Sequence, residues 1–388
     1  MPESWCWATI GELFQLQAGK FIEAPQISTC KDATHIYPCY GSNGLRGYVE
    51  SYNRDGLFPI IGRQGALCGN INIAEGKFYA TEHAVVVETF ANIDIQLFVY
   101  FLIQLNLNQY ATATAQPGLA VKTINEVPIP LPPINEQHRI SMAIEKSLDT
   151  LSEIDQSKHA IRKSILQLKS RILDLAISGK LAAQDCSDEP ALELLRSINQ
   201  SYAPCDNRHY ENIELSIPEP WCWATVGDVF NHNIGKALNS SNHSGIMMDY
   251  ITTSNLYWDR FDLSTVKQMP FTEKDLEKCT VTKGDLLICE GGDVGRSAIW
   301  NYNYDIRIQN HIHRLRGKAN ICVRYFFYVF MLYKQRNYIG GKGVAIQGLS
   351  SRDLNRLVIP LPPLNEQYRI AKSVDNLFST IDNILLEL

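Results

Sequence analysis

Long apolar runs are missing from this 388-residue sequence, and none approaches the roughly 20 residues that cross a bilayer. The opening residues 1–7 also lack the basic and then apolar stretches of a secretion signal. Ten cysteines are scattered along the chain, and none forms a Cys-x-x-Cys pair, which argues against a zinc ribbon or a redox motif. We therefore expect mostly buried, reduced thiols in a cytoplasmic protein.

Catalytic motifs of nucleic-acid enzymes are also missing. The sequence has no Asn-Pro-Pro-Tyr or Asp-Pro-Pro-Tyr to hold a flipped base, and no glycine-rich turn for a methyl-donor nucleotide. It has no Gly-x-x-x-x-Gly-Lys-Ser/Thr to bind ATP phosphates. Glu75-Gly76-Lys77 has the spacing of some nuclease sites, but no Pro-Asp precedes it, so we interpret it as a turn. These absences predict a protein without catalytic residues and without a cofactor.

The histidines of His311-Ile312-His313 are the one motif with metal-binding potential. Alternating residues share one face of a strand, so two such side chains can hold a metal ion together. No other ligand is evident in the sequence, however. We therefore expect no metal site and favour contact with bases or phosphates.

Charge is unevenly distributed along the chain. The formal net charge is −5, which argues against a uniformly basic surface. Residues 283–356 nevertheless contain twelve Lys or Arg against five Asp or Glu, whereas residues 1–128 contain seven against eleven. Such clusters are usually solvated faces, so the basic stretch permits nucleic-acid binding but does not establish it.

What the sequence does contain is an internal repeat. Residues 2–12, PESWCWATIGE, return at 218–228 as PEPWCWATVGD, and residues 129–140, IPLPPINEQHRI, return at 359–370 as IPLPPLNEQYRI. The intervening parts diverge, although Glu82-His83 is echoed by Asn310-His311. Constant ends around a variable middle indicate one scaffold that presents two specificities. We expect the four tryptophans of the constant ends to anchor the core.

The variable middles predict strand-rich domains. Short apolar segments such as 58–62 and 285–289 are bounded by glycines or polar turns, and one helix per unit is expected near 96–107 and 323–333. The expected class is α+β: two mixed α/β, strand-rich domains joined by two long antiparallel coiled-coil helices, with an internal pseudo-twofold repeat.

The constant tails predict the long helices. Each follows a Pro-Pro step and has Glu136 or Glu366 where a helix dipole favours negative charge. Apolar residues recur at spacings of three and four, as in the seam of a coiled coil, and Gly179 is placed to end the first helix. From 134 to 178 this helix would be roughly 67 Å long. The residues expected to pair the helices are Ile140, Ile144, Leu151, Ile154, Ile370, Val374, Leu377, Ile381 and Ile384. The alternative is that each helix packs on its own domain.

The ordered set of these motifs resembles the specificity subunits of type I restriction–modification systems. It consists of Trp-x-Trp, a variable region, Pro-Leu-Pro-Pro-x-Asn-Glu-Gln-x-Arg-Ile and a heptad helix, each present twice. Residues 177–181 and 188–191 also resemble that family's central conserved region. The resemblance covers nearly the whole chain. The second helix is expected to be the shorter one, because residues 157–216 have no counterpart after residue 388.

The resemblance implies two target recognition domains, each of which reads one half of a split site in double-stranded DNA. Their expected bounds are 1–133 and 218–363, with a helix at 134–181, a linker at 182–217 and a second helix at 364–388. The helices would set the gap between the half-sites and dock methyltransferase subunits, of which two are expected. Restriction or translocase subunits stay open as further partners, and no membrane is implied.

Candidate DNA-binding residues are polar or basic side chains beside glycines, because sequence is read at base edges and basic groups contact phosphates. The same residues can also simply form turns. In the first unit they are Ser42, Asn43, Arg46, Arg63, Gln64 and Gln116, with Lys122 as a phosphate contact. In the second unit they are Ser254, Asn255, Arg296, Gln309, Asn310, His311, Lys342, Gln347 and Arg352.

Other functions remain compatible with parts of the pattern. A recognition subunit of a methylation-only system would share all of these features. A DNA-modifying enzyme with a fused recognition domain requires a catalytic motif that the sequence lacks. A non-catalytic coiled-coil scaffold leaves the diverged, basic second unit unexplained.

Overall fold

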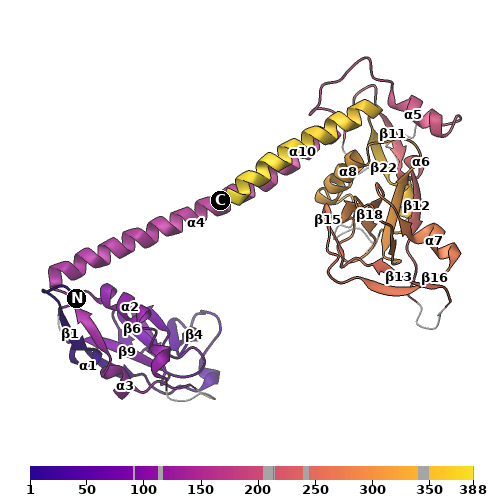
Figure 1. Ribbon diagram of the computed structural model, residues 1–388. Helices are drawn as coiled ribbons and strands as arrows, with labels where there is room; N and C mark the ends of the chain where they lie inside the picture. The colour runs from indigo at the N-terminus through magenta and orange to yellow at the C-terminus, as the bar shows by residue number, and fades with distance from the viewer. Residues whose placement is uncertain are drawn as a thin grey trace. The chain divides into compact units, whose positions relative to one another are not determined.

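The computed structural model describes residues 1–90, 92–111, 117–203, 213, 215–238, 244–339 and 349–387. It divides into two compact units, Met1–Gln156 and Ser157–Leu388, which appear in Figure 1 in indigo to magenta and in magenta to yellow. We refer to them as unit 1 and unit 2. Within the described ranges, no helix is both long enough and apolar enough to span a membrane.

Unit 1 contains two four-stranded sheets and a two-stranded ribbon. The sheets have the orders β2-β9-β6-β7 and β4-β3-β8-β5, and the ribbon pairs β1 with β10. All paired strands are antiparallel except β3 and β8. The strands are β1 (Cys6–Thr9), β2 (Phe14–Ala18), β3 (Tyr37–Gly41), β4 (Gly44–Val49), β5 (Arg54–Asp55), β6 (Phe58–Gly62), β7 (Ile71–Ala74), β8 (Lys77–Ala80), β9 (Ala84–Thr89) and β10 (Pro128–Leu131). The short helices are α1 (Ile10–Leu13), η1 (Ala24–Gln26), α2 (Ile95–Gln104), η2 (Leu107–Tyr110) and α3 (Val121–Asn125).

Unit 2 repeats this topology strand by strand. Its sheets have the orders β12-β21-β18-β19 and β16-β13-β20-β17, its ribbon pairs β11 with β22, and β13 and β20 are again the parallel pair. The strands are β11 (Cys222–Thr225), β12 (Phe230–Ile234), β13 (Ile246–Ile251), β16 (Lys267–Phe271), β17 (Thr280–Val281), β18 (Leu286–Cys289), β19 (Ser297–Ile299), β20 (Ile306–Ile308), β21 (Ile312–Gly317) and β22 (Val358–Leu361). The helices are α5 (Ala191–Ile198), α6 (Val226–Val229), α7 (Glu273–Cys279), α8 (Val323–Gln335) and α9 (Ser351–Arg356), and a hairpin of β14 (Leu256–Tyr257) and β15 (Arg260–Phe261) is added. The expected internal repeat is thus present at the level of the fold.

The repeated ends of the sequence explain the ribbon of each unit. Cys6 lies opposite Leu131 in unit 1, and Cys222 lies opposite Leu361 in unit 2. Prolines are tolerated in this position because a two-stranded ribbon has edge strands only. A capping box then begins the one-turn helix that follows, α1 or α6, and leads the chain into the first sheet. The constant motifs therefore close each domain.

One helix packs on the first sheet of each unit and completes its core. In unit 1 the rings of Phe14 on β2 and Phe98 on α2 meet edge to face, with centroids 5.3 Å apart. In unit 2 Phe230 on β12 and Phe326 on α8 make the same contact at 5.0 Å. Such aromatic pairs bury large apolar areas in a specific geometry. The two predicted helices, near 96–107 and 323–333, are the ones that supply these rings.

The constant tryptophans differ between the units. Trp221 is 5% exposed, and its Nε1–H donates to Glu366 Oε2 over 2.9 Å. Trp7 is 63% exposed, so the prediction that all four tryptophans anchor the core is wrong for this residue. In unit 2 the chain that follows the long first helix covers the ribbon, where the hydroxyl of Tyr202 donates to the carbonyl of Trp223 over 3.1 Å. Trp7 has no such cover among the described residues of unit 1.

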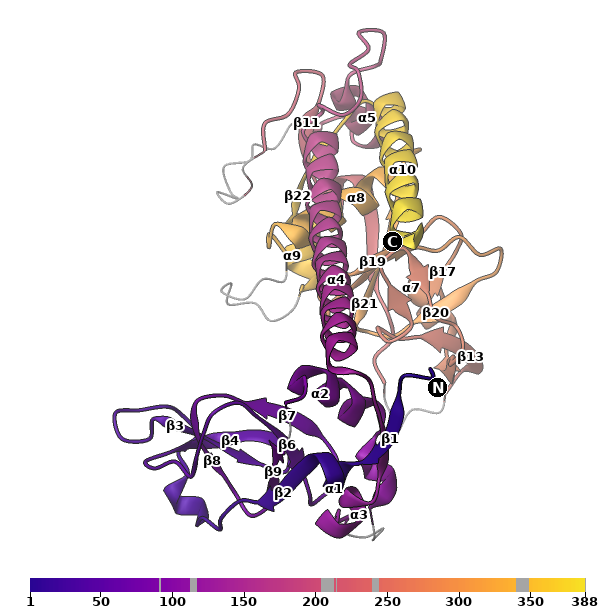
Figure 2. The same cartoon turned by 90° about the vertical axis from the view of Figure 1, so that its left-hand side faces the viewer.

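The two long helices have unequal lengths. α4 (Ile134–Ile177) has 44 residues and α10 (Leu364–Glu387) has 24. Gly179, with a φ of +69°, follows the end of α4 in the left-handed conformation that glycine favours. Within unit 2, α10 runs antiparallel beside the last part of α4, as Figures 1 and 2 show from two sides. Lys169 Nζ and Asp382 Oδ1 lie 2.5 Å apart across this helix pair.

Only some of the residues that were expected to pair the helices are buried. Ile370, Val374 and Ile381 are buried against the end of α4, where Ile172 and Leu173 are also buried. Ile140 and Ile144 are half-buried, and Leu377, Ile384, Leu151 and Ile154 are 39%, 48%, 57% and 45% exposed. The expected pairing of Leu151 and Ile154 is therefore not seen in the part of the chain described. α10 also packs on its own domain, where Arg324 and Tyr328 of α8 bind Asp375.

Candidate nucleic-acid interface

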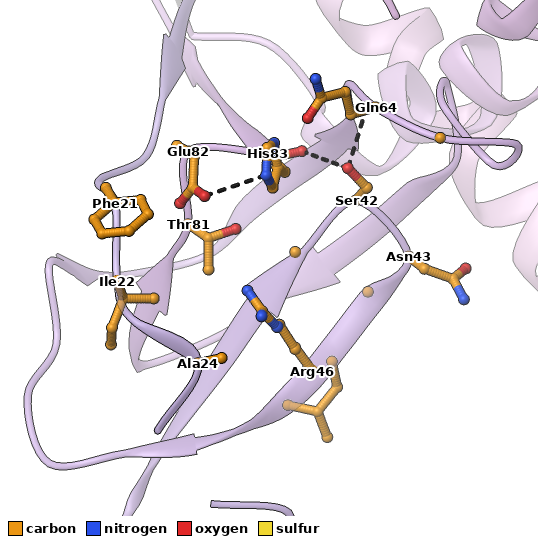
Figure 3. A pocket seen from close by; sticks show the side chains of 14 residues that line it. Phe21, Ile22, Ala24, Ser42, Asn43, Arg46, Gln64, Thr81, Glu82 and His83 are labelled. Carbon is orange, nitrogen blue, oxygen red and sulfur yellow. Dashed lines mark hydrogen bonds and ion pairs between the residues drawn. The ribbon is translucent and has the colours of Figure 1, made fainter. Parts of the chain in front are cut away.

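A pocket of about 710 Å³ opens in unit 1 where β3, β6 and β8 end. Four side chains predicted to bind DNA line it together: Ser42, Asn43, Arg46 and Gln64. Figure 3 shows Ser42 close to Gln64 and His83, and Arg46 below them on the neighbouring strand β4. The turns that looked separate in the sequence thus form one surface.

Hydrogen bonds of the Ser42 side chain to the backbone hold these turns close together. The Ser42 hydroxyl donates to the carbonyl of His83 and accepts from the N–H of Gln64, each over 3.1 Å. A Cβ atom added to Gly62 would lie 1.9 Å from the Ser42 carbonyl oxygen, so only glycine allows the approach. The parallel pairing of β3 with β8 continues in the bond from Thr81 N–H to the Tyr40 carbonyl, 2.9 Å long. The pocket wall is therefore rigidly built.

The lining residues that had not been predicted include three consecutive polar ones, namely Thr81, Glu82 and His83. Glu82 Oε1 lies 3.2 Å from His83 Nε2, and both side chains are partly exposed. Thr81 is fully buried, and its hydroxyl has no hydrogen-bond partner among the described residues. The echo between Glu82-His83 and Asn310-His311 was the sequence signal that could have found Glu82 and His83.

Charges of both signs act on the pocket. Arg46 is exposed, and its guanidinium makes no hydrogen bond or ion pair within the described ranges. A Cβ atom added to Gly41 would lie 3.7 Å from Arg46 Cδ and 3.7 Å from the Thr81 hydroxyl, so the two side chains border the same space. Beneath them, burial raises the pKa of the Cys39 thiol to about 11, and Arg46 and Glu82 act on it with opposite signs. Cys39 is accordingly a buried, neutral thiol rather than a nucleophile.

The other candidates of unit 1 take different positions. Arg63 is half-buried, and its backbone links the pocket to the next segment by accepting from the N–H of Leu119 over 2.8 Å. Lys122 is exposed on α3 and does not line the pocket. Gln116 lies outside the described residues.

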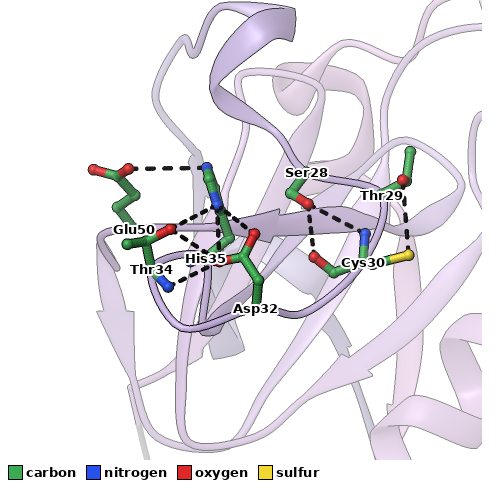
Figure 4. Close-up of polar contacts among 7 residues, drawn as sticks. All are labelled: Ser28, Thr29, Cys30, Asp32, Thr34, His35 and Glu50. Carbon is green, nitrogen blue, oxygen red and sulfur yellow. Dashed lines mark hydrogen bonds and ion pairs between the residues drawn. The ribbon is translucent and has the colours of Figure 1, made fainter.

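A polar turn shapes the connection that leads into β3 (Figure 4). The Asp32 carboxylate accepts from the backbone N–H groups of Thr34 and His35 over 2.8 and 2.7 Å, which lowers the pKa of Asp32 well below its usual range. His35 Nδ1 also lies 2.9 Å from Asp32 Oδ2. An aspartate turn of this kind fixes the chain without regular structure.

The equivalent region of unit 2 presents different side chains on the same backbone frame. Gln309 N–H donates to the Ile251 carbonyl over 3.1 Å, as Thr81 does to Tyr40. Asn310 and His311 follow, and His311 Nδ1 lies 3.4 Å from Glu290 Oε2. Arg296 is half-buried and donates from Nη2 to the Thr253 carbonyl over 2.7 Å. Ser254 and Arg352 are exposed, and Lys342 and Gln347 lie outside the described residues.

Two histidines and one asparagine require corrections. Asn255 is 3% exposed, and its amide donates to the carbonyls of Asp262 and Thr265 while its oxygen accepts from Thr252 N–H. Its role is to hold the turn, so we no longer propose it as a DNA contact. His311 and His313 do not act as a pair on one surface, because His313 is fully buried between His232 and the Leu349 carbonyl. Among the described residues no group of three or more His, Cys, Asp or Glu could hold a metal ion.

The same division into two units appears in a comparison with protein families. The type I restriction modification DNA specificity domain matches twice, at residues 2–166 and 218–387. The chain belongs to this family. Both copies of the specificity domain include one ribbon, both sheets and the beginning or whole of one long helix.

Individual relatives agree with this assignment. The chain is 42% identical over 167 residues to the type I restriction enzyme EcoprrI specificity subunit of Escherichia coli, a match that covers 43% of this chain and 41% of the relative. It is 21% identical over 466 aligned positions to the EcoAI specificity subunit of Escherichia coli, covering 99% and 79%.

Solved structures show the same fold. A structure from work on complex assembly and conformational transition of the type I R-M system covers 100% of this chain and 93% of its own, with a TM-score of 0.66 at 16% identity. The HsdS subunit from Thermoanaerobacter tengcongensis covers 99% and 91%, with a TM-score of 0.59 at 16% identity. The α+β fold with two specificity domains and a long helix is thereby confirmed.

Proposed function

We propose that this chain is the specificity subunit that recognises a bipartite site in double-stranded DNA for a type I restriction–modification complex. Each specificity domain reads one half of the site. The observation that carries the proposal is the pair of matching domains, which share one strand order but differ in the side chains that their turns present. Recognition of two different half-sites requires two domains of the same fold that present different side chains to DNA.

The chemistry of these turns suits base recognition. Major-groove readout uses amide, carboxylate, hydroxyl and guanidinium groups that reach base edges. Unit 1 offers Ser42, Arg46 and Glu82 around one pocket, and unit 2 offers Asn310 and His311 at the matching turn. The basic stretch at 283–356 adds charge that favours phosphate contacts.

The partners in this proposal are methyltransferase subunits, two per chain, with restriction subunits joining in a complete system. The apolar residues Leu148, Leu151 and Ile154 of α4 are 48%, 57% and 45% exposed. An exposed apolar stripe of this kind on a soluble protein marks an interaction site. We assign it to docking of the methyltransferase subunits, which the chain directs to DNA without a catalytic group of its own.

Selection from a random duplex library tests the proposal. The full chain, alone and with its methyltransferase subunits, should enrich two short sequences separated by a gap of constant length. Methyl transfer to the selected duplex should require the added subunits. Failure to enrich any sequence would favour a scaffold role instead, and methylation by the purified chain alone would contradict the absence of catalysis.

A further inference from the structure

The unit 1 pocket is lined by a guanidinium without a partner among the described residues and by a carboxylate. Arg46 comes from β4, and Glu82 comes from the turn between β8 and β9. The ion pair that Glu82 makes is with His83, and none joins it to Arg46 in the described chain. Both groups therefore keep hydrogen-bonding capacity for a ligand (Figure 3).

Two unpaired oxygen atoms of the lining residues also favour a ligand that donates hydrogen bonds. Glu82 Oε2 and the hydroxyl of Thr81 are buried, and neither has a hydrogen-bond partner among the described residues. Buried polar atoms are nearly always paired, and an unpaired one costs free energy. A donor group on a ligand that enters the pocket would satisfy them. A carboxylate accepts only, so the complementary ligand must carry N–H or O–H donors, and the base edges of DNA supply N–H donors.

A G·C base pair combines these groups in the pairings that arginine and carboxylate side chains favour. In the major groove, guanine presents the O6 and N7 acceptors that an arginine fork binds, and cytosine presents the N4 amino donor that a carboxylate accepts. We propose that the unit 1 pocket reads one G·C pair of the target, with Arg46 bound to guanine and Glu82 accepting from cytosine N4. This inference rests on the proposed function, because it specifies what unit 1 recognises.

The matching position in unit 2 carries a different side chain that can also contact a base. Glu82 and Asn310 occupy the same place in the fold, each directly after a residue bonded to the central strand, Tyr40 or Ile251. Asparagine is the side chain that pairs with adenine N6 and N7. The two units thus differ at this position in the way that different half-sites demand. Position 82 is a determinant of specificity rather than part of the common scaffold.

Sequence selection with three variants of the full chain, in complex with its methyltransferase subunits, tests the proposal. Wild type should require G·C at one pair of one half-site. Glu82→Gln should relax that pair toward A·T, because glutamine prefers adenine, and discrimination there should fall about tenfold or more. Arg46→Gln should weaken the same pair. Glu75→Gln removes an exposed carboxylate of the same unit that does not line the pocket, and it should leave every position unchanged.

The possible outcomes distinguish an error in the G·C assignment from an error in the proposed function. Unchanged G·C preference in both pocket variants, or changes confined to other base pairs, would overturn the assignment and leave the proposed function intact. Lack of any enriched sequence with wild type would overturn the proposed function itself. If Glu82→Gln loses the whole half-site through misfolding, Arg46→Gln decides, since Arg46 is exposed and makes no hydrogen bond or ion pair with the described residues.

Discussion

At the scale of single residues, unit 2 contains a chain of hydrogen bonds that requires neutral histidines. Asn355 Nδ2 donates to His232 Nδ1 over 2.9 Å, so His232 Nε2 donates to His313 Nδ1 and His313 Nε2 donates to the Leu349 carbonyl, over 2.9 and 2.7 Å. Each ring nitrogen has one role only in this tautomer assignment. Burial lowers the pKa of His313 to about 4.

We expect unit 2 to lose stability as the pH falls from about 6.5, the value of an unfolded histidine, to about 4. Between these pH values the unfolded state binds a proton at this histidine and the folded state does not. The stabilisation by neutral His313 is therefore complete above about pH 6.5 and is lost as the pH falls to about 4. His313→Gln should be less stable at neutral pH by about 1–2 kcal/mol but should show a shallower fall. Thermal unfolding followed by the fluorescence of Trp221, Trp223, Trp258 and Trp300 measures this.

His311→Gln, two positions away and exposed, serves as the control and should keep the wild-type slope. An equally steep fall in the His313→Gln variant would mean that another group titrates in this range.

At the residue level, the sequence located several of the turns that border the unit 1 pocket. Glycine-flanked turns indicated Ser42, Asn43, Arg46 and Gln64, and the fold brings all four to one pocket. Whether they bind DNA stays a prediction. Asn255 shows the limit, since a polar residue in a turn can face inward and bind the backbone. Local patterns show where a chain turns but not which side chains the packing buries.

At the scale of elements, the heptad pattern predicted both long helices and Gly179 predicted the end of α4, but neither showed which turns of α4 are covered. The pattern is nearly continuous from Ile140 to Leu175, yet α10 covers only the last part of α4. Periodicity shows that a helix has an apolar face, and the length of the partner helix decides which turns of that face are buried. The strand order was likewise beyond the sequence, because strands that pair are far apart along the chain.

Two isoleucines on α10 provide a matched test of the helix pair. Ile370 is fully buried and Ile384 is 48% exposed, although both were expected to pair. Ile370→Ala should lower the free energy of unfolding of unit 2 by about 2–5 kcal/mol through a lost contact and a cavity, and Ile384→Ala by at most about 0.5 kcal/mol. Urea unfolding followed by tryptophan fluorescence compares them. Equal losses would show that the end of α10 is packed as tightly as its beginning.

At the scale of the whole molecule, the two repeated halves of the sequence fold with the same strand order. The constant motifs at 2–12 and 129–140 form the closing ribbon and the beginning of the long helix in unit 1, and both recur in unit 2. The variable middles kept the order of their sheets while their side chains diverged. A fold that is retained while its pocket residues change is what modular recognition requires.

Modularity is the central claim, and a domain exchange tests it most directly. Residues 8–128 would be replaced by the same region of another type I specificity subunit, and the complex with its methyltransferase subunits would be used to select bound duplexes. The exchange leaves unit 2 and both long helices unaltered. The account predicts that one half-site changes to that of the donor while the other half-site and the gap stay the same. Simultaneous change of both half-sites would contradict it.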